Sequence, residues 1–550
     1  MKNVDLSWMS KESRTFLKDG YLLEGETAEE RYDFIAEYLG EKSGIGGFAE
    51  KWKYYISKKW ASFASPEIAN LGREKGLPAS CNFLEIQDTM ESIASAEYEM
   101  TMLASNGAGT ARNFSKIRPK GAKYGINGLS EGVLSWIESY ATKIDKTSQG
   151  GMRRGFLTAY LSVDHEEILD FLRIGREGHH IHNITTGVTI PKGWMESLLK
   201  GDKDKQNIFK EIHASRAEVG YPYILFEDNC NIGKHQVYVD KDKWLSNSNI
   251  CTECVEYTDE FKEFLCVLMS VNLEFYDEWK DTDFVFDCNL ALDIITDDYI
   301  EKAKHLKGHE KAVRFAEEHR AIGVGVMGLA TYFQKKMVPF GGLQSQAMNK
   351  MIFKHIREES DRASKWMAKE WGEPTFLKGY GDRNTSRIAI APTKSSSAIM
   401  GFVSQGIEPI KNNYHPKDLA KIMVDWKNPQ LEFLLESKGH NTEEVWDSIL
   451  ENGGSVQHLD ILDQNEKDVF KTFTEISQKD VIKLASDRQK YIDQSQSLNI
   501  IVAKGTKAKD ILKLTVEAWR SGIKTLYYQY NINASREKTK EIITCSSCEA

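Results

Sequence analysis

Short apolar runs alternate with amphipathic segments from about residue 65 to residue 500, and this alternation constrains the fold more than any other feature. The clearest runs are GFLTAYLSV, TTGVTIP, YPYILFED, VFDCNLAL, AIGVGVMGLA and SRIAIAP. Strands that alternate with helices are typical of βαβ units, and such units build a mostly parallel sheet or barrel. The pattern therefore predicts an α/β fold.

The segments on either side of this region have a different character. Residues 1–62 are charged, with aromatic side chains at helical spacing, and predict a small helical segment. Residues 63–530 form the expected α/β domain, within which a charged, helix-rich stretch near 430–495 predicts a peripheral insertion. Residues 531–550 are polar, and a polar run at a terminus is usually mobile.

Composition indicates a soluble protein and argues against several other classes. The chain has 550 residues, of which 41% are hydrophobic and 28% charged, as in ordinary soluble proteins. A formal net charge of −9 argues against a nonspecific nucleic-acid binder. We find no secretory signal and no apolar stretch of 18 residues. We therefore expect a cytoplasmic protein, in a bacterium or in the host of a virus, that binds neither nucleic acid nor membrane.

The stretch SNSNICTECVEY concentrates an amide, a carboxylate and two thiols in one short loop, as Asn249, Cys251, Glu253 and Cys254. A zinc site, a disulfide and a radical site are all compatible with it. The spacing of Cys251 and Cys254 suits zinc, although no second pair of His or Cys stands out. The histidines of HHIHN, residues 179–183, lack an adjacent carboxylate or cysteine, and we assign them a structural role.

Other cysteines suggest redox chemistry. Cys545 and Cys548 form a CxxC pair near the C-terminus, a spacing that suits zinc or a dithiol. Cys81 and Cys266 lie in apolar runs, where a single cysteine is usually a small buried hydrophobic residue. Together with Cys251 they suggest three kinds of thiol: one reactive, two that form a disulfide beside it, and two that reduce this disulfide by exchange.

An ordered series of motifs over residues 60–550 resembles one family, the catalytic large subunit of class I ribonucleotide reductase. The motifs are SCNFLEIQD, NGAGTARNFSKIRPKG, SQGGMRRG, SNICTEC, FLCVLMSVNL, APTKSSSAIMG, QGIEP, TLYY and the CxxC tail. The resemblance implies a ten-stranded α/β barrel of two half-barrels, with a central finger loop that carries a radical cysteine. It also implies reduction of ribonucleoside diphosphates to 2′-deoxyribonucleoside diphosphates for DNA synthesis.

The resemblance assigns roles to the loop. Cys251 matches the cysteine whose thiyl radical abstracts the 3′-hydrogen of ribose, with Glu253 taking the 3′-OH proton and Asn249 binding the sugar. Because residues two apart in an extended chain point to the same side, all three could face one ribose. Cys254 falls on the opposite side, where the family usually has an apolar residue, and we assign it a structural role.

The resemblance also assigns the remaining thiols and the tyrosines. Cys81 and Cys266 match the pair that supplies two electrons and becomes a disulfide. Cys545 and Cys548 match the shuttle that reduces it and is renewed by thioredoxin or glutaredoxin. Two adjacent tyrosines are ordinarily core or strand residues. In the motif TLYY they match the pair that carries the radical, namely Tyr527 and Tyr528.

The segment SRIAIAPTKSSSAIMG predicts a strand that leads into a helix N-terminus, which suits a diphosphate. A serine-rich helix cap is the simpler interpretation. The resemblance favours phosphate binding by Thr393, Ser395, Ser396 and Ser397, and the basic Lys394 could add affinity. Ser65 and Ser80 match two further substrate contacts.

A specificity site for a deoxynucleoside triphosphate or ATP is implied as well. Asp88 matches the residue that binds the effector sugar, Arg118 lies in the phosphate-contacting loop, and Gln149 and Arg153 lie in the flexible loop between effector and substrate. Such a site is usually built at a homodimer interface. Only 80 residues precede Cys81, so we expect no N-terminal ATP-cone and no inhibition by dATP through one.

In this class no cofactor is bound permanently in the large subunit. A separate small (beta) subunit that contains iron, manganese or both supplies the radical. Two other interpretations stay open. An adenosylcobalamin-dependent (class II) reductase has a similar barrel and thiols, but it does not need the tyrosine pair. An inactive nucleotide-binding regulatory paralogue would not need the set Cys81, Asn249, Cys251, Glu253 and Cys266.

Overall fold

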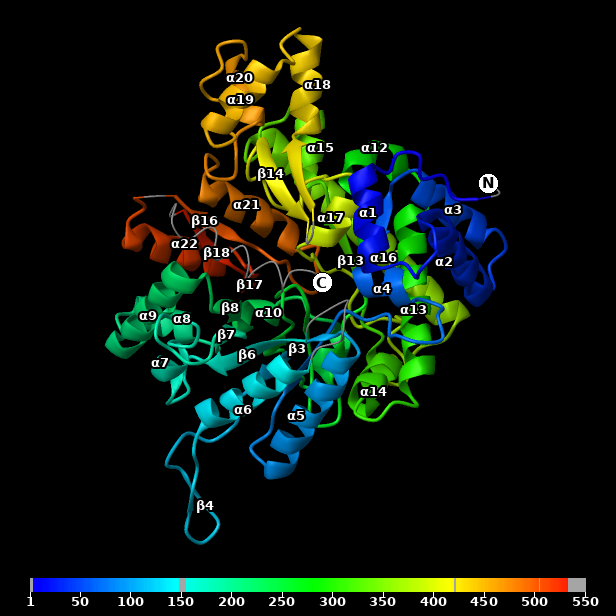
Figure 1. Cartoon of the computed structure of the whole chain (residues 1–550). Helices are drawn as coiled ribbons and strands as arrows, with labels where there is room; N and C mark the ends of the chain where they lie inside the picture. The colour runs from blue at the N-terminus through cyan, green and yellow to red at the C-terminus, as the bar shows by residue number, and fades with distance from the viewer. Residues whose placement is uncertain (1–2, 148–154, 420–421, 504, 533–550) are drawn as a thin grey trace.

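Three helices precede the sheets in the computed structural model, which describes residues 3–147, 155–419, 422–503 and 505–532 (Figure 1). They are α1 (Lys11–Gly20), α2 (Ala28–Ser43) and α3 (Phe48–Ser57). Helix α2 starts with a capping box, in which Thr27 and Glu30 each bond the other's backbone N–H. Trp52 of α3 is fully buried in the main core, so this helical segment packs against the body of the protein.

A seven-stranded sheet forms the first half of the body. Its five central strands are parallel and run in the order β2, β3, β6, β7, β8, which is also their order along the chain. Two short antiparallel strands, β11 and β17, close its edges. Because nearly every residue of the central strands is buried, their sequences read as apolar runs rather than as alternating patterns. The bounds of the seven strands are Cys81–Glu85 (β2), Gly109–Asn113 (β3), Phe156–Ser162 (β6), Thr185–Ile190 (β7), Tyr223–Phe226 (β8), Phe264–Leu265 (β11) and Thr525–Leu526 (β17).

Helices connect these parallel strands, as expected of βαβ units. They surround the sheet in the lower half of Figure 1. Their bounds are Met90–Ser105 (α5), Val133–Lys146 (α6), Ile168–Phe171 (α7), Trp194–Leu199 (α8) and Lys203–Val219 (α9).

A three-stranded sheet lies in the second half. Strands β12 (Leu268–Asn272) and β13 (Gly323–Met327) are parallel, and β1 (Ala61–Phe63) pairs with β12 in the antiparallel sense. Near it, β16 (Ile500–Val502) pairs in parallel with β18 (Gln529–Asn531). The helices of this half are α4 (Ser65–Asn70), α12 (Tyr276–Trp279), α13 (Phe284–Ala303), α14 (Glu310–His319), α15 (Leu329–Lys335), α16 (Leu343–Glu370), α17 (Lys394–Ile399), α21 (Gln478–Gln489) and α22 (Ala508–Arg520), with 3₁₀ turns η1 (Leu273–Phe275) and η2 (Thr375–Leu377).

Two of the six apolar runs are not strands. VFDCNLAL lies inside α13, and this helix is buried on nearly all its faces, so no helical periodicity is visible in its sequence. SRIAIAP runs beside β13, and the carbonyls of its Ser386 and Arg387 accept from the N–H groups of Ile322 and Val324. It forms only an isolated bridge, from Ile390 to Gln496. The strand predictions at these two places were therefore wrong.

A short hairpin carries the thiol-rich loop into the body. Its strands are β9 (Asn247–Ser248) and β10 (Val255–Glu256), paired in the antiparallel sense, and the loop joins them. Helices α10 (Glu227–Cys230) and α11 (Gln236–Asp240) lie between β8 and this hairpin. Ile250 of the loop packs over Gly109 of β3, where a Cβ would meet its Cδ1 at 2.5 Å. The glycine thus lets the loop approach the first sheet closely.

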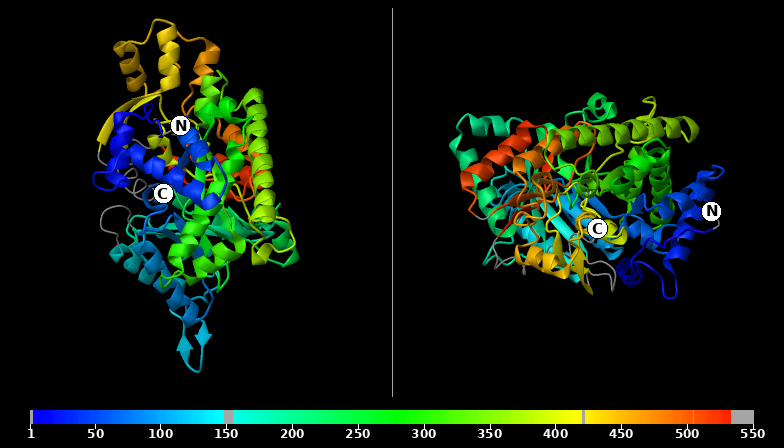
Figure 2. Two further views of the ribbon diagram at one scale, coloured as in Figure 1. Left: turned by 90° about the vertical axis from the view of Figure 1, so that its right-hand side faces the viewer. Right: turned by 90° about the horizontal axis from the view of Figure 1, so that it is seen from above.

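Two features extend from opposite ends of the molecule, as both the front view and the view turned about the vertical axis show (Figures 1 and 2). One is the hairpin of β4 (Lys123–Tyr124) and β5 (Gly128–Leu129). The other contains α18 (Pro429–Ser437), α19 (Glu443–Glu451) and α20 (Gln464–Val469), beside the hairpin of β14 (Tyr414–Leu419) and β15 (Ile422–Lys427). A separate apolar cluster from Leu431 to Phe470 holds these helices together. Helix α21, in contrast, packs on α16 and contributes to the main core.

In the part of the chain that the structure describes, no helix is both long enough and apolar enough to span a bilayer.

Candidate active site

The loop from Asn249 to Cys254 turns sharply rather than running extended. Thr252 adopts a left-handed conformation with φ 68°, and its N–H donates to the Asn249 carbonyl at 3.4 Å. The expectation that residues two apart share a side was therefore based on the wrong backbone conformation. Contacts with other elements hold the turn: the Tyr160 hydroxyl donates to the Asn249 carbonyl at 2.9 Å, and Thr525 Oγ1 donates to the Thr252 carbonyl at 2.9 Å.

A pocket lies beside this loop and brings together residues from both halves of the body. It encloses about 460 Å³ of space that is partly open to solvent. Half of its lining consists of residues predicted from the sequence as catalytic or substrate-binding. The lining is Ala64, Ser80, Cys81, Cys251, Glu253, Leu268, Met269, Ser270, Ala391, Pro392, Thr393 and Ser396.

The two thiols predicted as a redox pair lie side by side, with Cys81 at the start of β2 and Cys266 directly after β11, the antiparallel neighbour of β2. The β2–β11 register pairs Asn82 with Leu265, and one step further the Cys266 N–H donates to the Cys81 carbonyl at 2.9 Å. The side-chain hydrogen bond with Cys266 raises the pKa of the Cys81 thiol most, and burial raises it further. Burial also raises the pKa of Cys266. Both are therefore thiols rather than thiolates near neutral pH, which suits donors of hydrogen.

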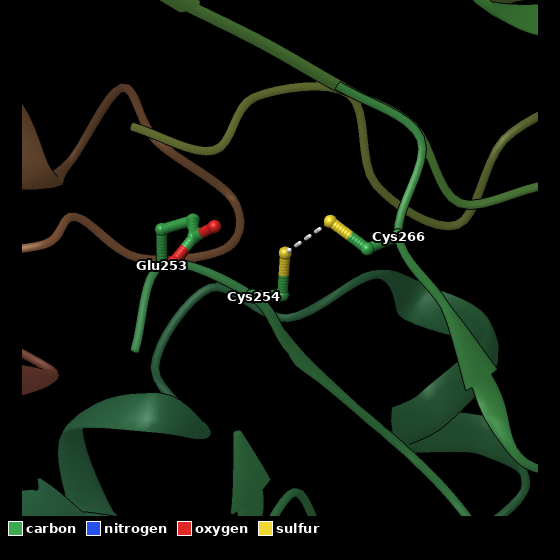
Figure 3. Close-up of side chains that lie close together, drawn as sticks. All are labelled: Glu253, Cys254 and Cys266. Carbon is green, nitrogen blue, oxygen red and sulfur yellow. Dashed lines mark hydrogen bonds between the residues drawn. The ribbon is translucent and has the colours of Figure 1, made fainter. Parts of the chain in front are cut away.

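Cys254 belongs to the same group of thiols. Its sulfur lies 3.6 Å from the Cys266 sulfur, and Figure 3 shows the two side chains pointing toward one another. Burial raises the pKa of Cys254 as well. The sequence predicted a purely structural role for Cys254, because in an extended loop its side chain would point to the side opposite Cys251 and Glu253. The turn at Thr252 changes that side.

Glu253 is a buried carboxyl with a strongly perturbed pKa. Burial raises its pKa to about 7, opposed by hydrogen bonds from its own backbone, Asn249 and Ser497. Ser497 Oγ lies 3.2 Å from Glu253 Oε2 and 2.5 Å from the Cys251 carbonyl oxygen. A carboxyl that titrates near neutral pH, in a pocket and beside a reactive group, is suited to accept and return a proton.

Asn249 links the loop to the redox pair. Its Nδ2 donates to the Cys81 sulfur at 3.2 Å, and its Oδ1 accepts from the Cys254 N–H at 3.0 Å. The side chain is fully buried and does not line the pocket. Asn249 therefore orients Cys81 and closes the turn.

The two tyrosines predicted to carry the radical lie next to Cys251. The Tyr527 hydroxyl is 3.5 Å from the Cys251 sulfur, and the rings of Tyr527 and Tyr528 are 4.4 Å apart. Tyr223 of β8 packs on both rings at 4.7 and 5.0 Å. Tyr530 stacks on Tyr528 at 6.0 Å and is partly exposed. The tyrosine rings thus form a continuous row from the Asn249–Cys254 loop toward the surface.

The segment predicted to hold phosphate ends in a short helix of six residues, α17. Thr393 precedes it with φ 57°, and its Oγ1 accepts from the Gly406 N–H at 2.7 Å. The Ser397 hydroxyl donates to the Val403 carbonyl. Of the residues predicted here, Thr393 and Ser396 line the pocket, whereas Lys394, Ser395 and Ser397 do not.

The two predicted serine contacts differ in position. Ser80 lies directly before β2 and lines the pocket. Ser65 begins α4, and its hydroxyl donates to the Tyr21 hydroxyl at 3.2 Å. Ser65 is buried and is not among the residues that line the pocket.

The predicted effector residues are described only in part. Asp88 and Arg118 form an ion pair of 2.7 Å, with about a third of each side chain exposed, and Arg118 also lies over the Tyr124 ring of the β4–β5 hairpin. Gln149 and Arg153 lie outside the described residues. The same holds for the predicted shuttle thiols, Cys545 and Cys548.

Three side chains that could ligate a metal gather at one place among the described residues. Ligand atoms of Glu253, Cys254 and Cys266 lie within 4.8 Å of one another (Figure 3). Cys251 is not in that group, so the zinc pair of Cys251 and Cys254 considered from spacing is not assembled. In the HHIHN segment, His180 instead pairs with Glu138 on the surface at 3.3 Å.

Sequence reasoning missed three residues that contact the loop: Tyr160, Ser497 and Thr525. Each comes from a strand or segment distant in the chain, and no local pattern marks it. Only the tertiary structure brings them to the site.

Comparisons with known proteins agree on one family. The family described as "Ribonucleotide reductase, barrel domain" matches residues 79–206, 200–377 and 374–529. A putative ribonucleoside-diphosphate reductase large subunit from Frog virus 3 is 32% identical and covers 94% of this chain and 95% of its own. The large subunit from Invertebrate iridescent virus 3 is 30% identical, with 93% and 92% covered. The solved structure of an Actinobacillus ureae class Id ribonucleotide reductase alpha subunit has a TM-score of 0.91 and 42% identity, over 98% of this chain and 99% of that one.

Proposed function

Because this chain belongs to the ribonucleotide reductase large-subunit family, we propose that its Asn249–Cys254 loop carries the radical chemistry of that family. The α/β barrel predicted from the sequence is confirmed, and so is the activity: the chain is the catalytic subunit of a ribonucleoside-diphosphate reductase. The loop, the thiol pair, the tyrosines and the pocket each have a distinct role in this reaction.

Cys251 is the residue that attacks the substrate, and Glu253 is its proton acceptor. The thiyl radical of Cys251 abstracts the 3′-hydrogen of a ribose bound in the pocket, and Glu253 takes the 3′-OH proton. The 2′-OH then leaves as water. The observation that carries this assignment is that Cys251, Glu253 and Cys81 line one pocket while the Tyr527 hydroxyl lies 3.5 Å from the Cys251 sulfur. Asn249 positions Cys81 and completes the sugar-binding side.

Cys81 and Cys266 supply the two electrons. Overall, one ribonucleoside diphosphate and two thiols give one deoxyribonucleoside diphosphate, one disulfide and one water, and Cys251 is recovered unchanged. The proximity of the two thiols supports the pair. We assign the reduction of their disulfide to Cys545 and Cys548, and the renewal of that tail pair to a thioredoxin or glutaredoxin.

The radical reaches Cys251 through Tyr528 and then Tyr527. The contact of 4.4 Å between the two rings, and the hydroxyl-to-sulfur contact beyond them, support a stepwise transfer of an electron and a proton. The source is a separate small subunit that contains iron, manganese or both. Class I members of the family generally pair with such a subunit.

Substrate and effector sites complete the proposal. Ser80, Thr393 and Ser396 are positioned at the pocket to bind the sugar and diphosphate, with Lys394 and the neighbouring Ser395 and Ser397 shaping the same turn. Asp88 and Arg118 form the effector site with Gln149 and Arg153, in a homodimer. A deoxynucleoside triphosphate or ATP would replace the Asp88–Arg118 ion pair by contacts to its sugar and phosphates.

CDP reduction by the purified chain, with dithiothreitol and an effector, tests this proposal in two arms. One arm adds adenosylcobalamin, and the other adds a radical-generating small subunit. We expect turnover only with the small subunit. Turnover with adenosylcobalamin alone would establish the class II mechanism and return the tyrosines to a core role.

Two matched variants sharpen the test. Tyr527→Phe removes the hydroxyl next to Cys251 and should abolish turnover in the small-subunit arm. Tyr299→Phe removes a buried tyrosine hydroxyl on α13 that has no hydrogen-bond partner among the described residues, and should leave turnover intact. Equal activity of the two variants would contradict the radical path. Complete inactivity of the wild-type chain in both arms would favour the regulatory paralogue.

A further inference from the structure

A third thiol faces the redox pair, and the reaction proposed above does not use it. The Cys254 sulfur lies 3.6 Å from the Cys266 sulfur, whereas Cys266 is also hydrogen bonded to Cys81. All three thiols are buried, with at most 2% of each residue exposed. Cys266 is therefore placed between two thiols, and either one can reach it.

Formation of a Cys254–Cys266 bond needs only a small movement. A disulfide has an S–S length of about 2.05 Å, so the two sulfurs must close by roughly 1.5 Å. Cys254 directly follows the turn of the loop, and Cys266 lies between β11 and β12 rather than inside a strand.

We propose that Cys254 is a third redox-active residue, which exchanges with the Cys81–Cys266 disulfide left by turnover. The Cys254 sulfur attacks the Cys266 sulfur. The Cys254–Cys266 bond forms, the Cys81–Cys266 bond breaks, and Cys81 leaves as a thiolate that takes up a proton. One disulfide is exchanged for another with no net change in electrons, so no further oxidant is needed. This inference rests on the proposed function, which supplies the first disulfide.

A proton acceptor for this exchange is already in place. The attacking group must be a thiolate, and a carboxylate oxygen of Glu253 lies within 4.8 Å of the Cys254 and Cys266 sulfurs (Figure 3). The Glu253 carboxylate is placed to accept the Cys254 proton as the sulfur attacks, although burial raises the pKa of this thiol. The proton can return to Cys81 through the same carboxyl or through the open pocket.

The exchange moves the disulfide away from the substrate. Cys81 lines the pocket together with Cys251, whereas Cys254 and Cys266 are not among its lining residues. After exchange the pocket again presents a free Cys81 thiol, and the oxidised bond is held behind it. The oxidised enzyme therefore stores its disulfide in two positions, and a reductant has to act on both.

Disulfide mapping after a single turnover tests the proposal. The fully reduced chain is mixed with its small subunit, effector and CDP without reductant, and then quenched in acid with N-ethylmaleimide. Trypsin alone leaves Cys251 and Cys254 on one peptide, between Lys243 and Lys262. A glutamate-specific protease, which cleaves after Glu253, separates them. Mass spectrometry then quantifies each disulfide, and dCDP is measured in the same sample.

Among the disulfides that Cys266 forms, we expect Cys254–Cys266 to account for at least about a tenth. A smaller share, with dCDP formed and Cys81–Cys266 as the product, overturns the proposal and leaves the proposed function intact. Absence of dCDP and of any disulfide is instead a failure of the proposed function itself.

Two variants distinguish exchange from chance oxidation. In Cys254→Ser, Cys266 should form a disulfide with Cys81 alone, and the labelling of Cys81 by N-ethylmaleimide after turnover should fall below that of the wild-type chain. Cys288→Ser removes another fully buried thiol, on α13 beside Tyr55, and should reproduce the wild-type distribution. A loss of the Cys254–Cys266 product in the Cys288 variant as well would overturn the specific role of Cys254.

Discussion

Removal of the Ser497 hydroxyl should shift the pH dependence of the enzyme upward. Ser497 Oγ donates to Glu253 Oε2 at 3.2 Å and thereby stabilises the charged carboxylate, which lowers its pKa. The same hydroxyl lies 2.5 Å from the Cys251 carbonyl, and it has only one hydrogen to share. Ser497→Ala should therefore raise the pKa of Glu253 above its present value of about 7.

The size of the shift follows from the contact. A hydrogen bond to a charged group contributes about 1.5–3 kcal/mol, and the shared hydrogen favours the lower end. One pKa unit corresponds to about 1.4 kcal/mol, so we expect a shift of about one unit. At pH 7 the carboxylate fraction would fall from about a half to about a tenth, which reduces the rate about fivefold. The loss should disappear above about pH 9, where the carboxylate is formed in both proteins.

The assay is kcat/KM for CDP from pH 6 to pH 9, with saturating small subunit and effector, because this ratio reports groups of the free enzyme. Thr525→Val is the matched control: it removes a hydroxyl that holds the same loop at the Thr252 carbonyl but does not contact Glu253. A loss in Ser497→Ala that is equal at all pH values, or a shift to lower pH, would refute the role of Glu253 as the proton acceptor. A shift of the same size in the control would refute the role of the Ser497 contact.

Three further predictions concern the effector site, a second buried carboxyl and the outer helices. Asp88→Ala should raise the effector concentration needed for half-maximal binding at least about tenfold, measured by calorimetry. It removes the carboxylate proposed to bind the effector sugar, and a hydrogen bond to a charged group contributes about 1.5–3 kcal/mol. Burial raises the pKa of Glu256 to about 7. The folded state therefore loses stability as pH rises from about 4.5 to about 7, because the carboxyl ionises more readily in the unfolded chain. Glu256→Gln should raise Tm at pH 8 relative to wild type, and the difference should be lost near pH 4.5. Phe470→Ala should destabilise the α18–α20 cluster by about 3–5 kcal/mol, seen as an earlier local transition in hydrogen exchange.

Each of these has a control that the chain supplies. Asp170→Ala breaks an exposed ion pair with Arg173 and should leave effector binding unchanged. If Glu256→Gln raises Tm equally at pH 4.5 and pH 8, the ionisation of Glu256 is not the cause. Phe433→Ala alters the same helical cluster at a residue that is 76% exposed, and a loss comparable to that of Phe470→Ala would contradict the burial argument.

The apolar runs and the ordered motifs of the chain were sufficient to predict the fold class and the reductase activity. Apolar runs such as those of β6, β7 and β8 predict strands because both faces of a parallel sheet are buried. The same reasoning failed for VFDCNLAL, since a helix buried on all sides produces an equally continuous run. Burial is recorded in such a sequence, but the backbone conformation is not.

The chemistry of the loop depended on tertiary structure. The sequence by itself determined which groups are present: Asn249, Cys251, Glu253 and the thiols of Cys81 and Cys266. Their order along the chain also determined the family. Only the folded structure decided that the loop turns at Thr252, which places the Cys254 sulfur on Cys266. The physical reason is that a side chain's direction depends on backbone dihedral angles, and here contacts from residues some 90 to 280 positions away in the chain hold those angles.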